Sequence, residues 1–133
     1  MTDQTDDLTV ADAEAAGQSG VVDWSELEYL KVLQKPGKVD LCRTLMTLYL
    51  SSLPQLFENA KAAAKAADGL TLAKNAHSMK SSSFAIGAVV FGKTCAELEK
   101  VGKSNELETA PTLLNRAESE FAATCSAFRN ALE

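Results

Sequence analysis

Hydrophobic residues recur at helical spacing along most of the chain after residue 22. A short stretch has apolar side chains at positions 24, 27, 30 and 33, and Asp23 precedes it as a candidate N-cap. Four longer amphipathic stretches follow, over residues 39–67, 70–88, 89–103 and 112–131. Pro54 lies inside the first of them and is expected to bend or split that helix. With no strand-like alternation between hairpin signals, the pattern predicts an all-α protein, an up-and-down four-helix bundle with a short leading helix.

The first 21 residues differ from the rest of the chain. They contain five acidic residues and no lysine or arginine, and they end in "GQSG". Because such a segment has little apolar area to bury, we expect a disordered, mobile acidic tail over residues 1–21. Residues 22–133 then form one bundle domain.

Composition argues against several classes of protein. A net charge of −5 and a pI of about 4.9 argue against general nucleic-acid binding, which needs a basic face. No apolar run approaches the roughly 20 residues that span a bilayer, and the N-terminus lacks the features of a secretory signal. We therefore expect a cytoplasmic protein that makes no membrane contact. The cysteines, Cys42, Cys95 and Cys125, lie far apart in apolar contexts and are expected to be buried thiols, and a single histidine without a CxxC pair predicts no metal site.

The only histidine, His77, belongs to the stretch over residues 70–88. At about 100° per residue, one side of this helix gathers the core stripe of Leu72, Ala76, Met79, Ser83, Ile86 and Val90. His77 lies roughly 150° from the middle of that stripe and is therefore expected to face solvent. The same side of the helix carries Ala73, Lys74, Lys80, Ser81 and Phe84.

These neighbours suggest a chemistry for His77, although an exposed histidine alone is usually an ordinary surface residue. Ala73 and Ser81, one turn to either side, leave room for a large partner, and Lys74 and Lys80 supply positive charge for an anion attached to the ring. A neutral imidazole has an unprotonated nitrogen that can act as a nucleophile. Neither a catalytic triad nor a metal cluster is apparent around this histidine, so the pattern favours transient phosphorylation.

The segment "AHSMKSSSFAIGA" closely resembles the signature of the histidine-containing phosphotransfer domains of multistep two-component phosphorelays. The resemblance extends over about residues 23–132. The positions that match the signature are Ala76, His77, Met79, Lys80, Ser82, Ser83, Ile86, Gly87 and Ala88.

The resemblance implies a four-helix bundle in which His77 accepts a phosphoryl group from one receiver-domain aspartate and passes it to another. Lys80 would assist the phosphoryl group. The implied partners are receiver domains of a hybrid sensor kinase or of response regulators, and a monomer is expected. The module would have no kinase activity and no cofactor of its own, in keeping with the lack of a glycine-rich nucleotide loop, and the catalytic Mg²⁺ would belong to the receiver.

Two residues depart from the family pattern. Ser81 occupies a position where glycine is usual, and its hydroxyl can bond the imidazole, a phosphoryl oxygen or the carbonyl of His77, or crowd the transfer path. Phe84 stands where a small residue is common. We expect Phe84 to join Ala73 and Lys74 in docking a partner, with packing under the leading helix as the alternative.

The other motif residues have structural interpretations. Ser82 and Ser83 are expected to permit close helix packing, and Gly87 to end the histidine helix as a C-cap. Two alternatives to phosphotransfer stay open at this point. One is a related module that docks receivers or kinases without being phosphorylated, and the other is an unrelated helical adaptor whose histidine is incidental.

Overall fold

The computed structural model describes residues 20–33 and 40–133 of the chain, and it is helical without strands over these residues. A short helix, α2 (Ser25–Leu33), leads into four long ones. The long helices are α3 (Leu41–Lys65), α4 (Gly69–Ala85), α5 (Val89–Ser104) and α6 (Ala110–Leu132), with a 3₁₀ turn, η1 (Leu107–Thr109), before the last.

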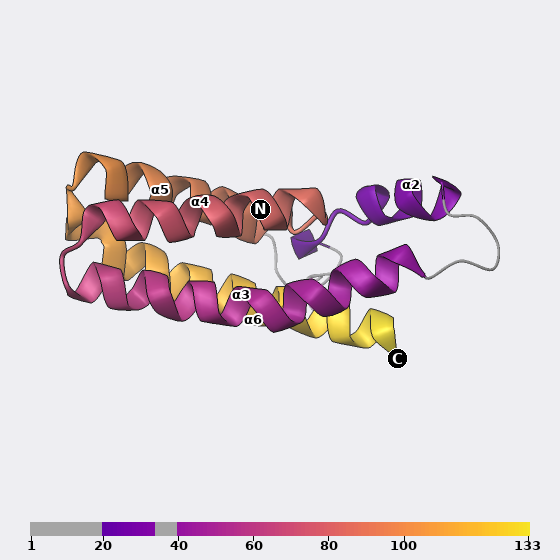
Figure 1. Ribbon diagram of the computed structural model, residues 1–133. Helices are drawn as coiled ribbons and strands as arrows, with labels where there is room; N and C mark the ends of the chain where they lie inside the picture. The colour runs from indigo at the N-terminus through magenta and orange to yellow at the C-terminus, as the bar shows by residue number, and fades with distance from the viewer. Residues whose placement is uncertain (1–19, 34–39) are drawn as a thin grey trace, which may run out of the picture.

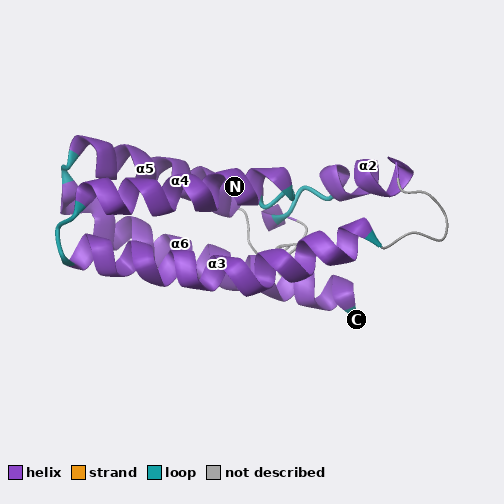
Figure 2. Ribbon diagram, in the orientation of Figure 1, coloured by secondary structure: helices purple, strands orange, loops and turns teal. Residues whose placement is uncertain are grey.

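The four long helices form an up-and-down bundle of two layers (Figures 1 and 2). One layer is α4 beside α5 and the other is α3 beside α6, and each helix packs against its two neighbours around the square. The α3–α4 and α5–α6 connections lie at one end, and the α4–α5 turn lies at the other, close to the start of α2 (Figure 1). The predicted fold class, including the leading helix, is confirmed.

Local sequence signals set several helix ends. The Asp40 carboxylate accepts a hydrogen bond from the Arg43 amide at 3.1 Å, and Asp68 caps α4 in the same way through Thr71, also at 3.1 Å. Pro54 neither ends nor splits α3, which runs on without interruption past this exposed position.

The end of α4 differs slightly from the prediction. Its C-cap is Ile86, and Gly87 is the next residue, with a φ of +87° that favours glycine. A Cβ atom on Gly87 would also collide with the Asp23 carbonyl. The Asp23 amide donates to the Gly87 carbonyl at 2.6 Å, so this turn fastens the start of the domain to the end of α4.

The core lies between the two layers and is rich in aromatic rings. Phe91 stacks within 4.9 Å of Phe121, measured between ring centroids, and Trp24 of the leading segment meets Phe128 edge-on at 5.7 Å. The predicted core stripe of α4 is confirmed, since all of its members are buried except Val90 of α5, which is partly buried. The three cysteines are buried and free, as expected.

Most of the predicted acidic tail, residues 1–21, lies outside the described residues. Of its last two positions, Gly20 is exposed and Val21 packs partly against the core, next to the buried Val22. The boundary between the acidic tail and the bundle domain stays a prediction. Among the described helices, none combines the length and apolar character needed to cross a membrane.

Candidate functional site

His77 lies in the middle of α4 with its ring open to solvent. Its side chain is 59% exposed, as the helical projection predicts, and its Nδ1 atom lies 3.0 Å from Oε2 of Glu99 on α5. Because a carboxylate can only accept a hydrogen bond, Nδ1 carries the proton in this contact. The lone pair of the neutral ring is then on Nε2, the nitrogen that Glu99 does not engage.

Glu99 is a buried carboxylate at the centre of a small charge network. Its side chain is only 8% exposed. Besides His77, its oxygens contact Nζ of Lys80 at 2.7 Å and Nζ of Lys103 at 3.1 Å. These partners outweigh the effect of burial, and they lower the pKa of Glu99 to about 2, with the Lys80 hydrogen bond as the largest cause. Glu99 is therefore ionised at neutral pH and holds Lys80 and His77 of α4 against α5.

The network depends on an unusually close approach of α4 and α5. A Cβ atom on Gly102 would lie 2.7 Å from the Ala73 amide nitrogen and 2.6 Å from the Gly69 carbonyl oxygen. Gly102 is one turn beyond Glu99, and Ala73 is one turn before His77. Two small residues thus bring the backbones together where the buried carboxylate must reach across to the ring.

This close packing corrects one prediction. Ala73 is 4% exposed, so it lies under α5 rather than on an open docking surface. Its small side chain sets the spacing between the helices instead of leaving room for a partner. Lys74 and Ser81, by contrast, are exposed on α4 as expected.

Phe84 is partly exposed, as the docking prediction requires, but it also covers a neighbouring helix, and the alternative of packing under the leading helix is wrong. Its side chain is 39% exposed, and its ring covers Gly92 of α5, where an added Cβ would lie 2.9 Å from Cε1 of the ring. The aromatic side chain is therefore partly a packing residue, placed on α5 and not under the leading helix. Its remaining exposed edge lies two turns beyond His77.

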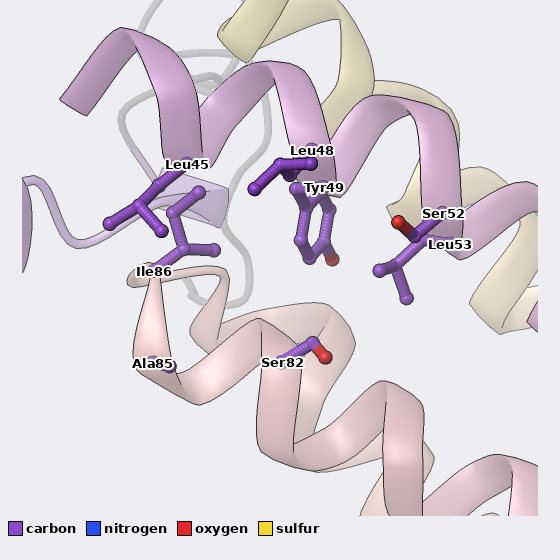
Figure 3. A pocket seen from close by; sticks show the side chains of 8 residues that line it. All are labelled: Leu45, Leu48, Tyr49, Ser52, Leu53, Ser82, Ala85 and Ile86. Atoms are coloured by element: carbon purple, nitrogen blue, oxygen red, sulfur yellow. The ribbon is translucent and has the colours of Figure 1, made fainter. Parts of the chain in front are cut away.

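The motif serines have separate environments. Ser83 is fully buried, and its Oγ lies 2.7 Å from the hydroxyl of the buried Tyr49, which ties α4 to α3. Ser82 is exposed and faces a mainly apolar groove of about 230 Å³ between the same two helices. Figure 3 shows the residues that line this groove: Leu45, Leu48, Tyr49, Ser52, Leu53, Ser82, Ala85 and Ile86.

Comparison with known proteins identifies the family. The model of the Hpt domain matches residues 44–132 of the chain. The chain belongs to the Hpt domain family. Its structure is also similar to the crystal structure of histidine-containing phosphotransfer protein B from Pseudomonas aeruginosa PAO1, with a TM-score of 0.77 and 28% sequence identity over 84% of this chain and 94% of that one. No curated protein matches the chain.

Sequence reasoning on this Hpt domain missed Glu99 and Lys103. Neither residue was among the candidate site residues, and the structure places the buried Glu99 carboxylate beside His77, 22 residues away in the sequence. The pair Glu99 and Lys103, four residues apart on one helix, was a local signal, but only the register of α4 on α5 shows that it faces the histidine. Among the described residues, no group of three or more histidine, cysteine or acidic side chains is arranged to hold a metal ion.

Proposed function

We propose that the protein is a phosphorelay intermediate that accepts a phosphoryl group on Nε2 of His77 from a receiver-domain aspartate and passes it to the aspartate of another receiver. Membership in the Hpt family supports histidine phosphotransfer in two-component signalling. One observation supports His77 as the acceptor: the ring is open to solvent while a buried, ionised carboxylate engages its other nitrogen.

The transfer requires a nucleophile that becomes positively charged as it reacts. The Nε2 lone pair attacks the phosphorus atom of an aspartyl phosphate, a P–N bond forms, and the P–O bond to the aspartate breaks and leaves its carboxylate. The Nδ1 proton stays on the ring, and Glu99 stabilises the charge that the imidazole gains. The reverse sequence returns the phosphoryl group to an aspartate, with Mg²⁺ supplied by the receiver.

The two lysines have a positioning role in this scheme. The expectation from the sequence that Lys80 assists the phosphoryl group stays a prediction, and its ammonium lies 2.7 Å from Oε1 of Glu99. We propose that Lys80 and Lys103 keep Glu99 ionised in its buried position and thereby hold the ring. Ser81, exposed one turn after His77, borders the path along which the phosphoryl group arrives.

The experiment uses a receiver domain that carries a radiolabelled aspartyl phosphate. The wild-type protein should acquire label that is labile in acid and stable in alkali, as expected for phosphohistidine. His77→Gln should acquire none. The matched control is Ser78→Ala, because Ser78 is the adjacent exposed residue of the same helix and should accept phosphate normally.

Two outcomes would contradict the proposal. A folded His77→Gln protein that still acquires label would refute His77 as the site. A wild-type protein that binds the receiver in a titration but never acquires label would favour the non-phosphorylated docking module.

A further inference from the structure

The surface around His77 differs in charge between its two sides. Toward α5, the ring lies next to Glu99, which also binds Lys80 and Lys103. Toward α3, charged side chains are scarce, because residues 44–57 and 81–92 contain no aspartate, glutamate, lysine or arginine. At the average charged fraction of the chain, 23%, these two segments would contain about six such residues. The lack of charge is therefore a local property of the α3 side.

The α3 side combines a stripe of α3 with the outward residues that follow His77 on α4. By helical spacing, the α3 stripe extends from Leu45 to Asn59, and the α4 residues turn from His77 toward α3. We call these residues the uncharged face: Leu45, Leu48, Ser52, Gln55, Asn59, Ser78, Ser81, Ser82 and Ala85. All of them are exposed except Leu45, which is partly buried. Lys74, one turn before His77, lies at the edge of this face.

The uncharged face contains the groove of about 230 Å³ between α3 and α4. Figure 3 shows Leu45 beside Ile86 at one end of this groove and Ser52 beside Leu53 at the other. Leu48, which also lines the groove, is 54% exposed. Because small-molecule pockets usually begin at roughly 300 Å³, the groove fits one or two apolar side chains of a partner protein better than a small ligand.

The groove is close enough to His77 for one partner to cover both. Ser81 lies one turn after His77, and Ala85, which lines the groove, lies two turns after it, about 12 Å along the helix axis. Because α3 and α4 are antiparallel, the Ser52 end of the groove is the end nearer to His77. A standard interface buries roughly 800 Å² on each partner, which corresponds to a patch about 30 Å across. A partner that reaches Nε2 therefore also covers a neighbouring side of the bundle.

The α5 side is the more costly of the two sides to bury. A partner there would remove water from Lys103, which is 68% exposed and holds Glu99, and from the exposed Lys100. Desolvation of charges costs free energy that a new ion pair often fails to recover, and charged residues are depleted at the centres of interfaces. On the uncharged face, the same contact would bury leucine and alanine side chains together with hydroxyl and amide groups that can hydrogen-bond a partner.

From this contrast and from the continuity of the groove with His77, we infer that the receiver domain docks on the uncharged face and inserts apolar side chains into the groove beside Leu48. The inference rests on the proposed function, because it names where the partner of His77 binds. It also defines the receivers that fit, which present an apolar, uncharged surface next to their reactive aspartate. A receiver with a lysine or glutamate at that place would leave a charge buried without a partner.

The test measures binding of an unphosphorylated response-regulator receiver domain to the full-length protein by calorimetric titration. Leu48→Lys and Ser82→Lys each place a charge in the groove, from α3 and from α4, at exposed positions outside the core. The matched control is Leu70→Lys, because Leu70 is 67% exposed and lies two turns before His77 on α4, about 10 Å away and outside the uncharged face. Lys100→Gln tests the α5 side. Urea unfolding checks that each variant is folded.

Leu48→Lys and Ser82→Lys should each raise the dissociation constant at least about tenfold. Leu70→Lys and Lys100→Gln should change it less than about threefold. Because the docking surface is uncharged, the wild-type dissociation constant should also change less than about threefold from about 0.15 M to about 1 M salt, over which the Debye length falls from about 8 Å to about 3 Å.

Three results would overturn the inference. Equal affinities for Leu48→Lys and Leu70→Lys would exclude the groove from the interface. A loss of affinity in Lys100→Gln, together with a steep dependence on salt, would place the receiver on the α5 side. A wild-type dimer that Leu48→Lys converts to a monomer, with unchanged receiver affinity, would assign the face to a second copy of the chain.

Phosphoramidate separates this inference from the proposed function, because this small phosphoryl donor needs no docking surface. It should label His77 equally fast in the wild type, Leu48→Lys and Leu70→Lys, whereas a phosphorylated receiver should label Leu48→Lys more slowly than the other two. If Leu48→Lys weakens receiver binding but the receiver never transfers phosphate to the wild type, the docking site stands and the phosphotransfer proposal fails. If the receiver labels all three proteins equally fast, phosphotransfer stands and the docking inference is refuted.

Discussion

Glu99 offers the sharpest test of how the site is built. Replacing it by glutamine removes the charge that three groups share, while an amide oxygen remains to accept the Nδ1 proton of His77. Replacing it by alanine removes both the charge and the acceptor. Glu97→Gln is a matched control, because Glu97 lies two residues earlier on α5, is 52% exposed and pairs only with partners outside the site.

The expected loss of stability in Glu99→Gln follows from the pKa of Glu99, which is lowered from an ordinary value of 4.5 to about 2. A group whose pKa is lowered by folding stabilises the protein fully above its unfolded pKa, and the contribution is lost as pH falls from about 4.5 toward 2. The shift sets an upper bound of about 3 kcal/mol. Because His77 and Lys103 are more than half exposed, screening by solvent reduces this value, and we expect Glu99→Gln to cost about 1–2 kcal/mol at pH 7.

Urea unfolding between pH 7 and pH 2.5 measures this contribution directly. The gap in free energy of unfolding between the wild type and Glu99→Gln should be constant above about pH 5 and should narrow as the wild-type carboxylate is protonated. Glu97→Gln should cost less than about 0.5 kcal/mol at every pH. A gap that stays constant down to pH 2.5, or that is equal for the two variants, would refute the buried charge network.

The rate of phosphoryl acceptance then distinguishes the effect of the Glu99 charge from its effect on the orientation of the His77 ring. Glu99→Gln should slow acceptance less than Glu99→Ala does, since glutamine still fixes the ring tautomer. We expect a loss of roughly tenfold or less for glutamine and a larger loss for alanine, in the range found when a positioned acid–base partner is removed. Equal rates for the wild type and both variants would show that Glu99 supports only the packing of α5 on α4.

Substitutions at four further positions test the surroundings of this network by urea unfolding and by receiver-dependent phosphorylation. His77→Gln should change the free energy of unfolding by less than about 0.5 kcal/mol, because the ring is mostly exposed, and should abolish acceptance; a large loss of stability would mean that the ring is a packing residue. Ser81→Leu should nearly stop transfer, and Ser81→Gly should transfer at least as fast as the wild type. The glycine variant should lose up to about 1 kcal/mol of unfolding free energy because glycine is a poor helix former. Equal transfer rates for the wild type and both variants would show that position 81 does not border the path of the phosphoryl group. Phe84→Ala should cost about 1–2 kcal/mol, less than a fully buried ring, and a cost above about 3 kcal/mol would place the ring in the core. Gly102→Ala should cost about 3 kcal/mol and slow transfer as well, because its Cβ would force α5 away from α4; a near-neutral result would contradict the close approach.

The helices were predictable because their signals are local. The spacing of apolar residues in "TLAKNAHSMKSSSFAI" places Met79 inward and His77 outward whatever the neighbours are, and Asp68 caps its helix through an amide only three residues away. The core stripe of α4 could be predicted from the sequence of that helix alone. Of the two outcomes expected at Pro54, a split is excluded, because α3 continues from Leu41 to Lys65 through this exposed position.

The site was predictable only in part because it is shared between two helices. A helical projection gives the angle between His77 and Ala73 but says nothing of which sector the next helix covers. In the structure, α5 covers the sector of Ala73 and part of the Phe84 ring, and it leaves His77 open. Glu99 is positioned by that same contact, so no pattern within the histidine helix could reveal it.

The contact between α4 and α5 explains why one histidine is both anchored and exposed. Small residues bring the backbones together one turn before His77, at Ala73 and Gly102, and Gly92 receives the ring of Phe84 two turns after it. Between these two points Glu99 is shielded from water, and a buried carboxylate is tolerated only where it is fully paired. Of its partners, His77 and Lys103 are mostly exposed, and because Nδ1 of His77 faces Glu99, the pairing that stabilises the bundle leaves Nε2 as the ring nitrogen that Glu99 does not engage. Substitutions that change the spacing of α4 and α5 should therefore reduce stability and transfer together, whereas replacement of the exposed His77 ring should change transfer alone.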